Sequence, residues 1–368
     1  MRATAETGHA TYLATRHFGS LDGLRFLCIS AVIWHHTLGS ADLIDRSILF
    51  VRGHVGVDFF FVLSGFLITT LLLREEAAKG RFSLRGFYWR RALRILPVYY
   101  LVVGLAAFNE IVLKGQTESL SLVPYYIFFL SNFLTEHIGF LDPTWSLSVE
   151  EQYYLIWPAL LLLLPRRWIP ALLLALIGLH LLVFLGVFDR LGITAIPAGP
   201  LLIGLGDATE AILMGSLAAL VLNSPTGFAR LAPLFRPRAM PWLCLGLLIL
   251  ALAAFPGALR GWPNLLVHGL MTATLISLVV REDNGMAGLL KLRPIVRIGQ
   301  VSYGIYLYHL FAHGVMLAVF TRFGLTGPGL FFFSYYALTF VIAEISFRSF
   351  EAWFQNLRHK PLRRVAAG

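Results

Sequence analysis

Long uninterrupted runs of apolar residues constrain this chain more than any other feature of its sequence. A run of about 20 apolar residues has the length of a helix that crosses a bilayer. Lipid offers the backbone no hydrogen bonds, so only helices and closed barrels can span it, and barrel strands are alternating segments of only about 10 residues. Hydrophobic residues make up 57% of the chain and charged residues only 14%. We therefore predict an all-α, polytopic membrane protein in which residues 1–368 form one transmembrane domain.

Ten apolar runs are candidates for transmembrane helices. They are residues 24–39, 55–73, 95–113, 145–164, 169–188, 200–222, 241–256, 263–280, 298–320 and 328–354. The stretch Leu120–Leu134 is also apolar, but it is short and contains Pro124 and Asn132. We predict that residues 121–134 form a re-entrant or interfacial segment rather than an eleventh crossing.

The distribution of basic residues favours ten crossings. With a cytoplasmic N-terminus, the predicted inner segments hold 23 of the 30 Lys and Arg residues and the outer loops hold 6. Cytoplasmic loops are enriched in Lys and Arg, and an eleventh crossing would abolish this asymmetry. We therefore expect a protein of the cytoplasmic (inner) membrane with both termini in the cytoplasm and no cleaved secretory signal. This topology and attraction to anionic membrane lipid account for the net charge of +10 without a nucleic-acid partner.

Ionisable residues within the predicted first span are candidates for a functional site, because charge is costly in lipid. Arg25 and His36 are eleven residues apart, which corresponds to about three helical turns and about 16 Å on one helix face. Arg25 would lie at the inner end and His36 in the outer half. The alternative is that Arg25 is a snorkelling anchor and that His35 and His36 are an interfacial pair satisfied by water.

A cluster of arginines opens the third predicted span. In the stretch Phe87–Pro97, Arg91 and Arg94 are three residues apart and Arg90 and Arg94 are four apart, so two guanidinium groups can converge on one anion. This arrangement suits the phosphates of a donor such as coenzyme A. The alternative is ordinary positive-inside arginines beside Trp89 in an aromatic belt.

Two adjacent glutamates lie about one turn into the predicted helix that follows Thr144. Glu150 could orient a histidine, hold an acceptor hydroxyl or carry a proton. Glu151 is the better candidate for a glutamate that only complements the helix dipole. Trp145 and Ser148 of the same stretch are candidates to line a substrate path.

Other polar residues carry weaker signals. Asp58 and Ser64 could line a pore, although the small pair of Ser64 and Gly65 also suits helix packing. Tyr303 and His309 could line a polar pore or be hydrogen-bonded between helices. Three more acidic residues are buried-charge candidates without assigned partners, and no Cys or His spacing predicts a metal site. These acidic residues are Asp207, Glu210 and Glu344.

Five motifs in order resemble the acyltransferase-3 family of bacterial membrane acyltransferases, the O-antigen acetylase-like group, over most of the chain. They are LDGLRFLCISAVIWHH (Leu21–His36), GVDFFFVLSGFLIT (Gly56–Thr69), FYWRRALRILPVYY (Phe87–Tyr100), TWSLSVEEQYYLIWP (Thr144–Pro158) and VSYGIYLYH (Val301–His309). The resemblance implies that His36 is the essential histidine of an Arg-x10-His pattern starting at Arg25. It also implies roles for Arg91 and Arg94 of an Arg-x-x-Arg pattern and for Glu150 of a Trp-Ser-Leu-x-x-Glu pattern.

The family resemblance implies O-acylation, commonly acetylation, of a cell-envelope or exported carbohydrate. Acetyl-CoA or another acyl-CoA would be the co-substrate, without a metal, and the chain would be the standalone type without a C-terminal hydrolase-like domain. Our hypothesis is that His36 acts as general base or as a covalent acyl carrier, and that Glu150 orients or charge-stabilises its imidazole. A homodimer is compatible with the sequence. The alternative function is a secondary transporter or flippase for a polyol or lipid-linked sugar, since such folds also carry intramembrane charges.

Overall fold

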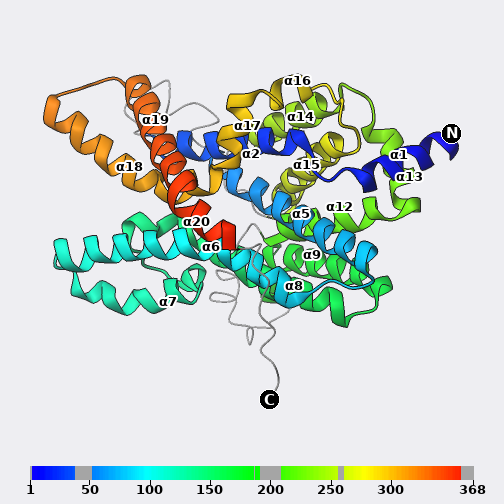
Figure 1. Ribbon diagram of the computed structural model, residues 1–368, viewed down its shortest axis with the longest axis horizontal. Helices are drawn as coiled ribbons and strands as arrows, with labels where there is room; N and C mark the ends of the chain where they lie inside the picture. The colour runs from blue at the N-terminus through cyan, green and yellow to red at the C-terminus, as the bar shows by residue number, and fades with distance from the viewer. Residues whose placement is uncertain (1, 38–51, 186, 191–208, 256–260, 358–368) are drawn as a thin grey trace, which may run out of the picture.

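The structure is a computed structural model and describes residues 2–37, 52–185, 187–190, 209–255 and 261–357. Every regular element in these ranges is helical (Figure 1). The α-helices are α1 (Arg2–Ala14), α2 (Gly19–His35), α5 (Val55–Lys79), α6 (Leu84–Ala107), α7 (Val123–Ile127), α8 (Trp145–Leu163), α9 (Ile169–Phe184), α10 (Val187–Arg190), α12 (Thr209–Asn223), α13 (Pro225–Phe235), α14 (Met240–Ala254), α15 (Trp262–Val279), α16 (Ala287–Leu290), α17 (Arg293–Gln300), α18 (Ser302–Phe323), α19 (Pro328–Ser346) and α20 (Ala352–Asn356). Short π or 3-10 turns comprise Phe108–Leu113, Thr117–Leu122, Ser131–Phe133, Gly139–Thr144, Arg166–Trp168 and Phe347–Glu351.

Six of these helices are long and apolar enough to cross a membrane. They are Val55–Lys79, Leu84–Leu113, Arg166–Val183, Trp262–Val279, Ser302–Phe323 and Pro328–Asn356. A seventh crossing is available if Thr209–Asn223 and Pro225–Phe235, which are bent by 107°, count as one span, and Met240–Ala254 is a shorter apolar helix. The all-α, multi-pass architecture is therefore confirmed, whereas ten crossings remain a prediction.

Several predicted bounds differ from the observed helices. The third span begins at Leu84 rather than at residue 95, because Ser83 caps the helix by accepting a hydrogen bond from Gly86 N. The ninth span is interrupted at Val301, so residues 298–300 belong to the amphipathic helix α17 and the apolar helix starts at Ser302. Residues 38–39, 186, 200–208 and 256 of the predicted spans lie outside the described residues.

The helices α5 and α12 pack more closely than any side chain larger than glycine would allow. A Cβ atom on Gly65 would collide with Ile212 O, and one on Gly215 would collide with Val62 O. Small residues at such contacts let two backbones approach in a membrane protein. The packing role considered for Gly65 is therefore confirmed.

Residues 114–144 contain no helix long enough for an eleventh crossing, whereas the re-entrant or interfacial position of 121–134 stays a prediction. They lie against α6 and α8 as short turns (Figure 1), where Tyr99 Oη donates to Tyr126 O at 2.8 Å. Ser148 Oγ lies 2.8 Å from Ser131 Oγ, so Ser148 fastens this segment to α8. Ser148 is not among the residues that line the cavity described below, and its predicted place on a substrate path stays a prediction.

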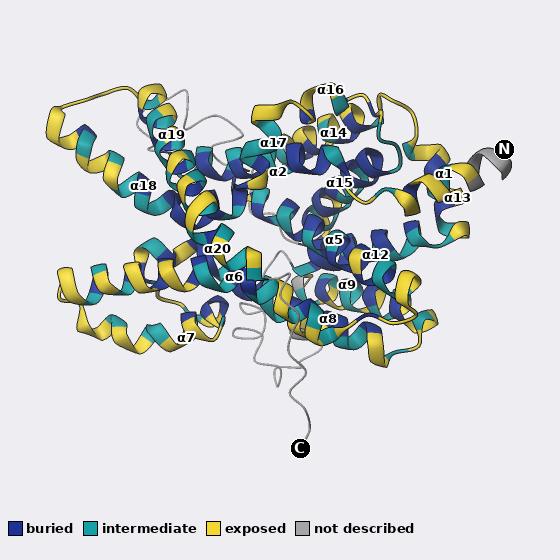
Figure 2. Cartoon of the chain, viewed as in Figure 1, coloured by how far each residue is buried: buried dark blue, intermediate teal, exposed yellow. Residues whose placement is uncertain are grey.

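Apolar side chains are exposed on the outside of the helical assembly. Figure 2 shows exposed residues along α18, α19, α6 and α7 and buried residues along α2, α5 and α12. Water does not favour so large an apolar surface, whereas lipid does. Large examples are Leu105, Phe108, Leu155, Leu163, Phe323, Phe333 and Ile345.

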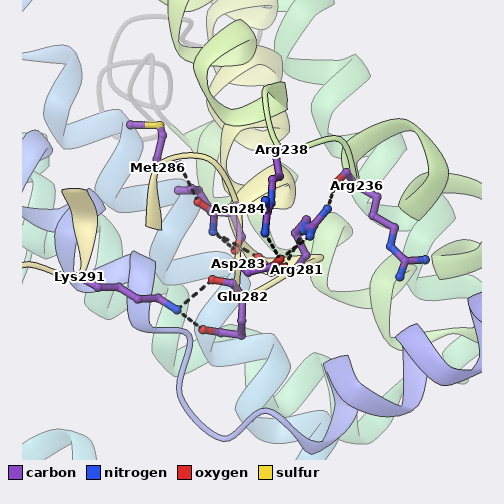
Figure 3. Close-up of polar contacts among 9 residues, drawn as sticks. Arg236, Arg238, Arg281, Glu282, Asp283, Asn284, Met286 and Lys291 are labelled. Carbon is purple, nitrogen blue, oxygen red and sulfur yellow. Dashed lines mark hydrogen bonds and ion pairs between the residues drawn. The ribbon is translucent and has the colours of Figure 1, made fainter. Parts of the chain in front are cut away.

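The segments that the sequence analysis assigned to the inner side contact one another. His9 Nε2 lies 3.2 Å from Asn223 O, and Arg166 Nη2 lies 2.5 Å from Glu76 Oε2. Residues 236–238 and 281–285 are tied by the Arg238–Asp283 and Arg281–Asp283 ion pairs, at 2.9 and 2.5 Å (Figure 3). Arg74 also donates a hydrogen bond to Thr15 O, so the described basic connections lie together at one end of the helices.

Candidate functional site

A cavity of about 510 Å³ that is lined by several charged residues lies between the helices near this basic end. Its volume is in the range of small-molecule sites, about 300–1,000 Å³. Residues from α2, α5, α6, α8, α18 and the stretch 347–355 line it. Five arginines and four acidic residues face it, which is an unusually high charge for a protein of this composition. These residues are Arg16, Arg25, Arg74, Arg91 and Arg94, with Asp22, Glu150, Glu151 and Glu351.

Three of the four arginines that the sequence singled out line the cavity. Arg25 forms an ion pair with Asp22 at 2.8 Å, which holds its guanidinium at the start of α2. Arg91 lies over the ring of Tyr154, with Cζ 3.7 Å from the ring centroid, in a cation–π contact. Arg94 also lines the cavity.

Arg90 lies elsewhere. Its Nη2 is 2.9 Å from Glu75 Oε2, and its side chain is 48% exposed. Position 90 is one residue before Arg91, and successive residues of a helix point about 100° apart. The convergence expected of Arg90 and Arg94 is therefore not observed, and Arg91 and Arg94 are the pair that faces the cavity.

Glu150 lies in the cavity wall beside these arginines. Ser64 Oγ donates a 2.6 Å hydrogen bond to its Oε1, which links α5 to α8. The contact of Glu150 is therefore with Ser64, and not with the His36 imidazole that the sequence analysis expected it to orient. Glu151 also lines the cavity, which differs from the purely peripheral role expected for it.

His36 and His309 meet at the other end of α2. Their ring centroids are 4.8 Å apart at an interplanar angle of 71°. His36 Nδ1 lies 2.9 Å from Val32 O, and His309 Nδ1 lies 2.6 Å from Tyr306 O. A carbonyl can only accept, so each neutral ring carries its proton on Nδ1 and has its lone pair on Nε2. The geometry provides two neighbouring imidazole bases.

Tyr306 and Ser146 separate the cavity from this histidine pair. Both residues line the cavity, and Ser146 Oγ lies 2.7 Å from Tyr306 Oη. Tyr306 O in turn accepts the hydrogen bond from His309. The polar groups therefore continue from the cavity to His36 through one turn of α18.

The remaining candidates divide between the cavity and the protein core. Tyr303 lines the cavity and donates to Ile95 O at 2.9 Å. The Trp145 ring packs 6.3 Å from that of Phe61, centroid to centroid, outside the cavity lining. Asp58 belongs to a separate buried cluster with His268.

Of the unassigned acidic residues, Glu210 joins the Asp58 cluster, and Glu344 pairs with Arg297 and Arg348. Asp207 lies outside the described residues. Within the described residues, no group of three or more His, Cys, Asp or Glu is arranged to hold a metal ion.

Sequence reasoning missed several residues of the cavity, among them Asp22, Glu351 and Tyr154. Asp22 is three residues before Arg25, a spacing that brings helical side chains together and could have identified the ion pair. Glu351 is an acidic residue within the last predicted span, which was a usable signal. Tyr154 gave no signal, because only the packing of α6 on α8 brings its ring under Arg91.

The fold and the cavity define a multi-pass membrane protein with a charged internal site. Comparison with known sequences identifies its family, because an acyltransferase domain matches residues 18–347. The chain belongs to the acyltransferase-3 family. No solved structure matches the chain at a significant level.

Several curated proteins are similar to the chain. A protein named peptidoglycan O-acetyltransferase OatA from Listeria monocytogenes is 30% identical, over 93% of this chain and 56% of its own length. The putative peptidoglycan O-acetyltransferase YrhL of Bacillus subtilis is 30% identical over 80% of this chain and 48% of its own length. The O-acetyltransferase OatA of Staphylococcus aureus is 24% identical over 91% and 57%. The chain therefore spans about half the length of these relatives.

Proposed function

We propose that the protein transfers an acyl group, acetyl in the first instance, from acyl-CoA to a hydroxyl group of a cell-envelope carbohydrate. The observation that carries the proposal is the charged cavity lined by Arg25, Arg91 and Arg94. Its lining also includes Tyr306, whose carbonyl accepts a hydrogen bond from His309 beside His36. Family membership and the names of the relatives supply the reaction class. Peptidoglycan is the first acceptor to test, because two of those names specify it.

The basic side of the cavity suits the phosphates of coenzyme A. Arg91 and Arg94 lie one helical turn apart on α6, about two to three turns after its start at Leu84, so the two guanidinium groups rather than the helix terminus would bind the anion. Arg91 packs over the ring of Tyr154 and lines the cavity together with Glu150 and Glu151. The nucleotide would bind at this basic end, and the flexible pantetheine arm would carry the thioester inward.

His36 would act at the opposite end of the path. Its Nε2 lone pair can take the proton of the acceptor hydroxyl, a contribution of about 10²–10⁴-fold. The alternative is a covalent acyl-histidine that carries the acyl group to the acceptor. Because Glu150 bonds to Ser64 beside the arginines, its proposed role is electrostatic, at the donor end of the cavity.

The proposed topology keeps ten crossings, with both termini and the basic cavity mouth in the cytoplasm. The contacts among the basic connections support this arrangement, because segments that touch must share one side of the membrane. The excess of Lys and Arg in these segments then assigns that side to the cytoplasm. Acyl-CoA would enter from the cytoplasm, and His36 would lie toward the outer face.

The test is release of free thiol from acetyl-CoA by purified protein in detergent, with and without peptidoglycan fragments or crude envelope glycans. Turnover that requires the acceptor and is lost in His36→Ala would support the proposal. Binding of coenzyme A without any transfer to the glycan pool would point to another acceptor. Absence of acyl-CoA binding, combined with transport of a polyol or lipid-linked sugar in vesicles, would favour the transporter alternative.

A further inference from the structure

A second group of ionisable side chains lies buried outside the cavity. His268 of α15 is flanked by Asp58 of α5, with Nε2 to Oδ2 at 3.4 Å, and by Glu210 of α12, with Nδ1 to Oε2 at 3.3 Å. His180 of α9 lies on the other oxygen of Glu210, with Nδ1 to Oε1 at 3.7 Å. Asn264 Nδ2 donates to Glu210 Oε2 at 3.1 Å. Carboxylates and imidazoles therefore alternate across four helices.

This cluster is almost completely removed from solvent. The side chains of His268 and Glu210 are 0% exposed, that of His180 is 8% exposed and that of Asp58 is 15% exposed. Groups of this kind are costly in a membrane protein and mark ion or proton sites. The acyl-transfer path described above makes no use of them, because the cavity lining contains none of the four.

The geometry around His268 requires an additional proton. A neutral imidazole has one N–H group and one lone pair, so one of its nitrogens would direct a lone pair at a carboxylate oxygen. An imidazolium, or a protonated carboxyl group on one side, removes this repulsion. Two carboxylates and one imidazolium still sum to a negative charge, and a buried net charge is unfavourable. A second proton between Glu210 and His180 would make the cluster neutral, and Glu210 Oε1 has no hydrogen bond within the described residues.

One end of the cluster leads toward the surface. His54 precedes Asp58 by four residues, or one helical turn, at the start of α5, and it is exposed. The ring centroid of His54 lies 5.2 Å from that of His35, and the His35 centroid lies 5.1 Å from that of His36. Imidazoles can accept a proton at one nitrogen and release it from the other.

We propose that Asp58, His268, Glu210 and His180 form a buried proton-binding site that exchanges its proton with solvent through His54. The proton is transferred as H⁺ between lone pairs of the side chains, and no other bond changes. The charge of the site also influences the protonation of His35 and His36, because His54 contacts His35 and His35 contacts His36. This last consequence rests on the proposed function, whereas proton binding itself does not.

The test is infrared difference spectroscopy of the full-length protein in lipid nanodiscs between acidic and neutral pH. We expect the band of a protonated carboxyl group that shifts in heavy water and is lost in Glu210→Gln. The exposed Glu118 supplies the matched control, because Glu118→Gln removes a carboxylate far from the cluster and leaves the band unchanged. The spectrum needs no acyl donor, so it remains interpretable if the proposed function fails.

Three results would overturn the proposal. One is the absence of such a band in the wild-type protein. This measurement does not depend on whether any variant folds. Another is an unchanged band in Asp58→Asn and Glu210→Gln proteins whose thermal unfolding shows that they are folded. The third is a band that responds to Na⁺ at constant pH and not to pH, since this would indicate a cation site. If acyl transfer is observed, Asp58→Asn should also shift the pH profile of the transfer rate. A merely structural role of Asp58 would leave that pH profile unchanged.

Discussion

The imidazole rings of His36 and His309 lie edge to face, with centroids 4.8 Å apart, although the residues come from α2 and α18. Both rings use Nδ1 to donate to a carbonyl of their own helix. The lone pair of each neutral ring therefore lies on Nε2, and Tyr306 connects His309 to the cavity lining. The predictions below follow from this pair, from the cavity and from the packing of the helices.

His36→Ala should lower acyl transfer by about 10²–10⁴-fold, because it removes the proposed base or acyl carrier. The adjacent His35 is the matched control, since it lies outside the contact with His309. His35→Ala should therefore retain most of the activity. Thiol release under saturating acetyl-CoA measures both variants. Equal losses in the two would contradict the assignment of His36.

Arg91→Ala and Arg94→Ala should each raise the KM for acyl-CoA by about 10-fold or more, since a hydrogen bond to a charged group contributes about 1.5–3 kcal/mol. Arg90 offers a control of the same charge on the same helix, because it pairs with Glu75 at the surface. Arg90→Ala should leave KM within about 2-fold of the wild type. Initial rates at varied acyl-CoA give these values. An unchanged donor KM in Arg91→Ala and Arg94→Ala would refute their contact with the donor.

Gly65→Ala and Gly215→Ala should each destabilise the protein by about 1–3 kcal/mol, because the added methyl group would force α5 and α12 apart. Gly104 lies within α6 and has open space around it. Gly104→Ala should be neutral or slightly stabilising, because alanine favours a helix over glycine. Thermal unfolding in one detergent compares the three variants. A Tm for Gly65→Ala at or above the wild-type value would show that the helices can separate at little cost.

Asp283 should make stability depend on pH in the acidic range. Hydrogen bonds from Arg281 and Arg238 hold the pKa of its carboxyl group well below the usual value (Figure 3). A lowered folded-state pKa stabilises the fold above the unfolded pKa of about 3.9, and this contribution is lost as the pH falls through the folded pKa. Asp283→Asn should therefore lower Tm at roughly neutral pH. The difference in Tm between the variant and the wild type should shrink below about pH 4. A difference that does not change with pH would assign the effect to packing instead.

The apolar runs by themselves determined the all-α membrane architecture, because a helix forms all the hydrogen bonds of its backbone N–H and C=O groups within one segment in lipid. Local spacing also predicted which residues share a helix, as for Arg91 and Arg94, and the ordered motifs predicted the family. The number of crossings could not be fixed in this way. Hydropathy sets only a soft limit on where a span begins, and it did not indicate the helix break at Val301 between α17 and α18.

Only the tertiary structure decided which polar residues from different helices meet. Glu150 bonds to Ser64 rather than to His36, and Asp58 joins His268 and Glu210 instead of the cavity. Arg90 and Arg91 are neighbours in sequence, but Arg90 pairs with Glu75 at the surface whereas Arg91 lines the cavity. The physical reason is that helical periodicity fixes directions within one helix, whereas close contacts such as Gly65 against Ile212 set the distances between helices. The spacing of residues along the sequence does not determine the distances between helices.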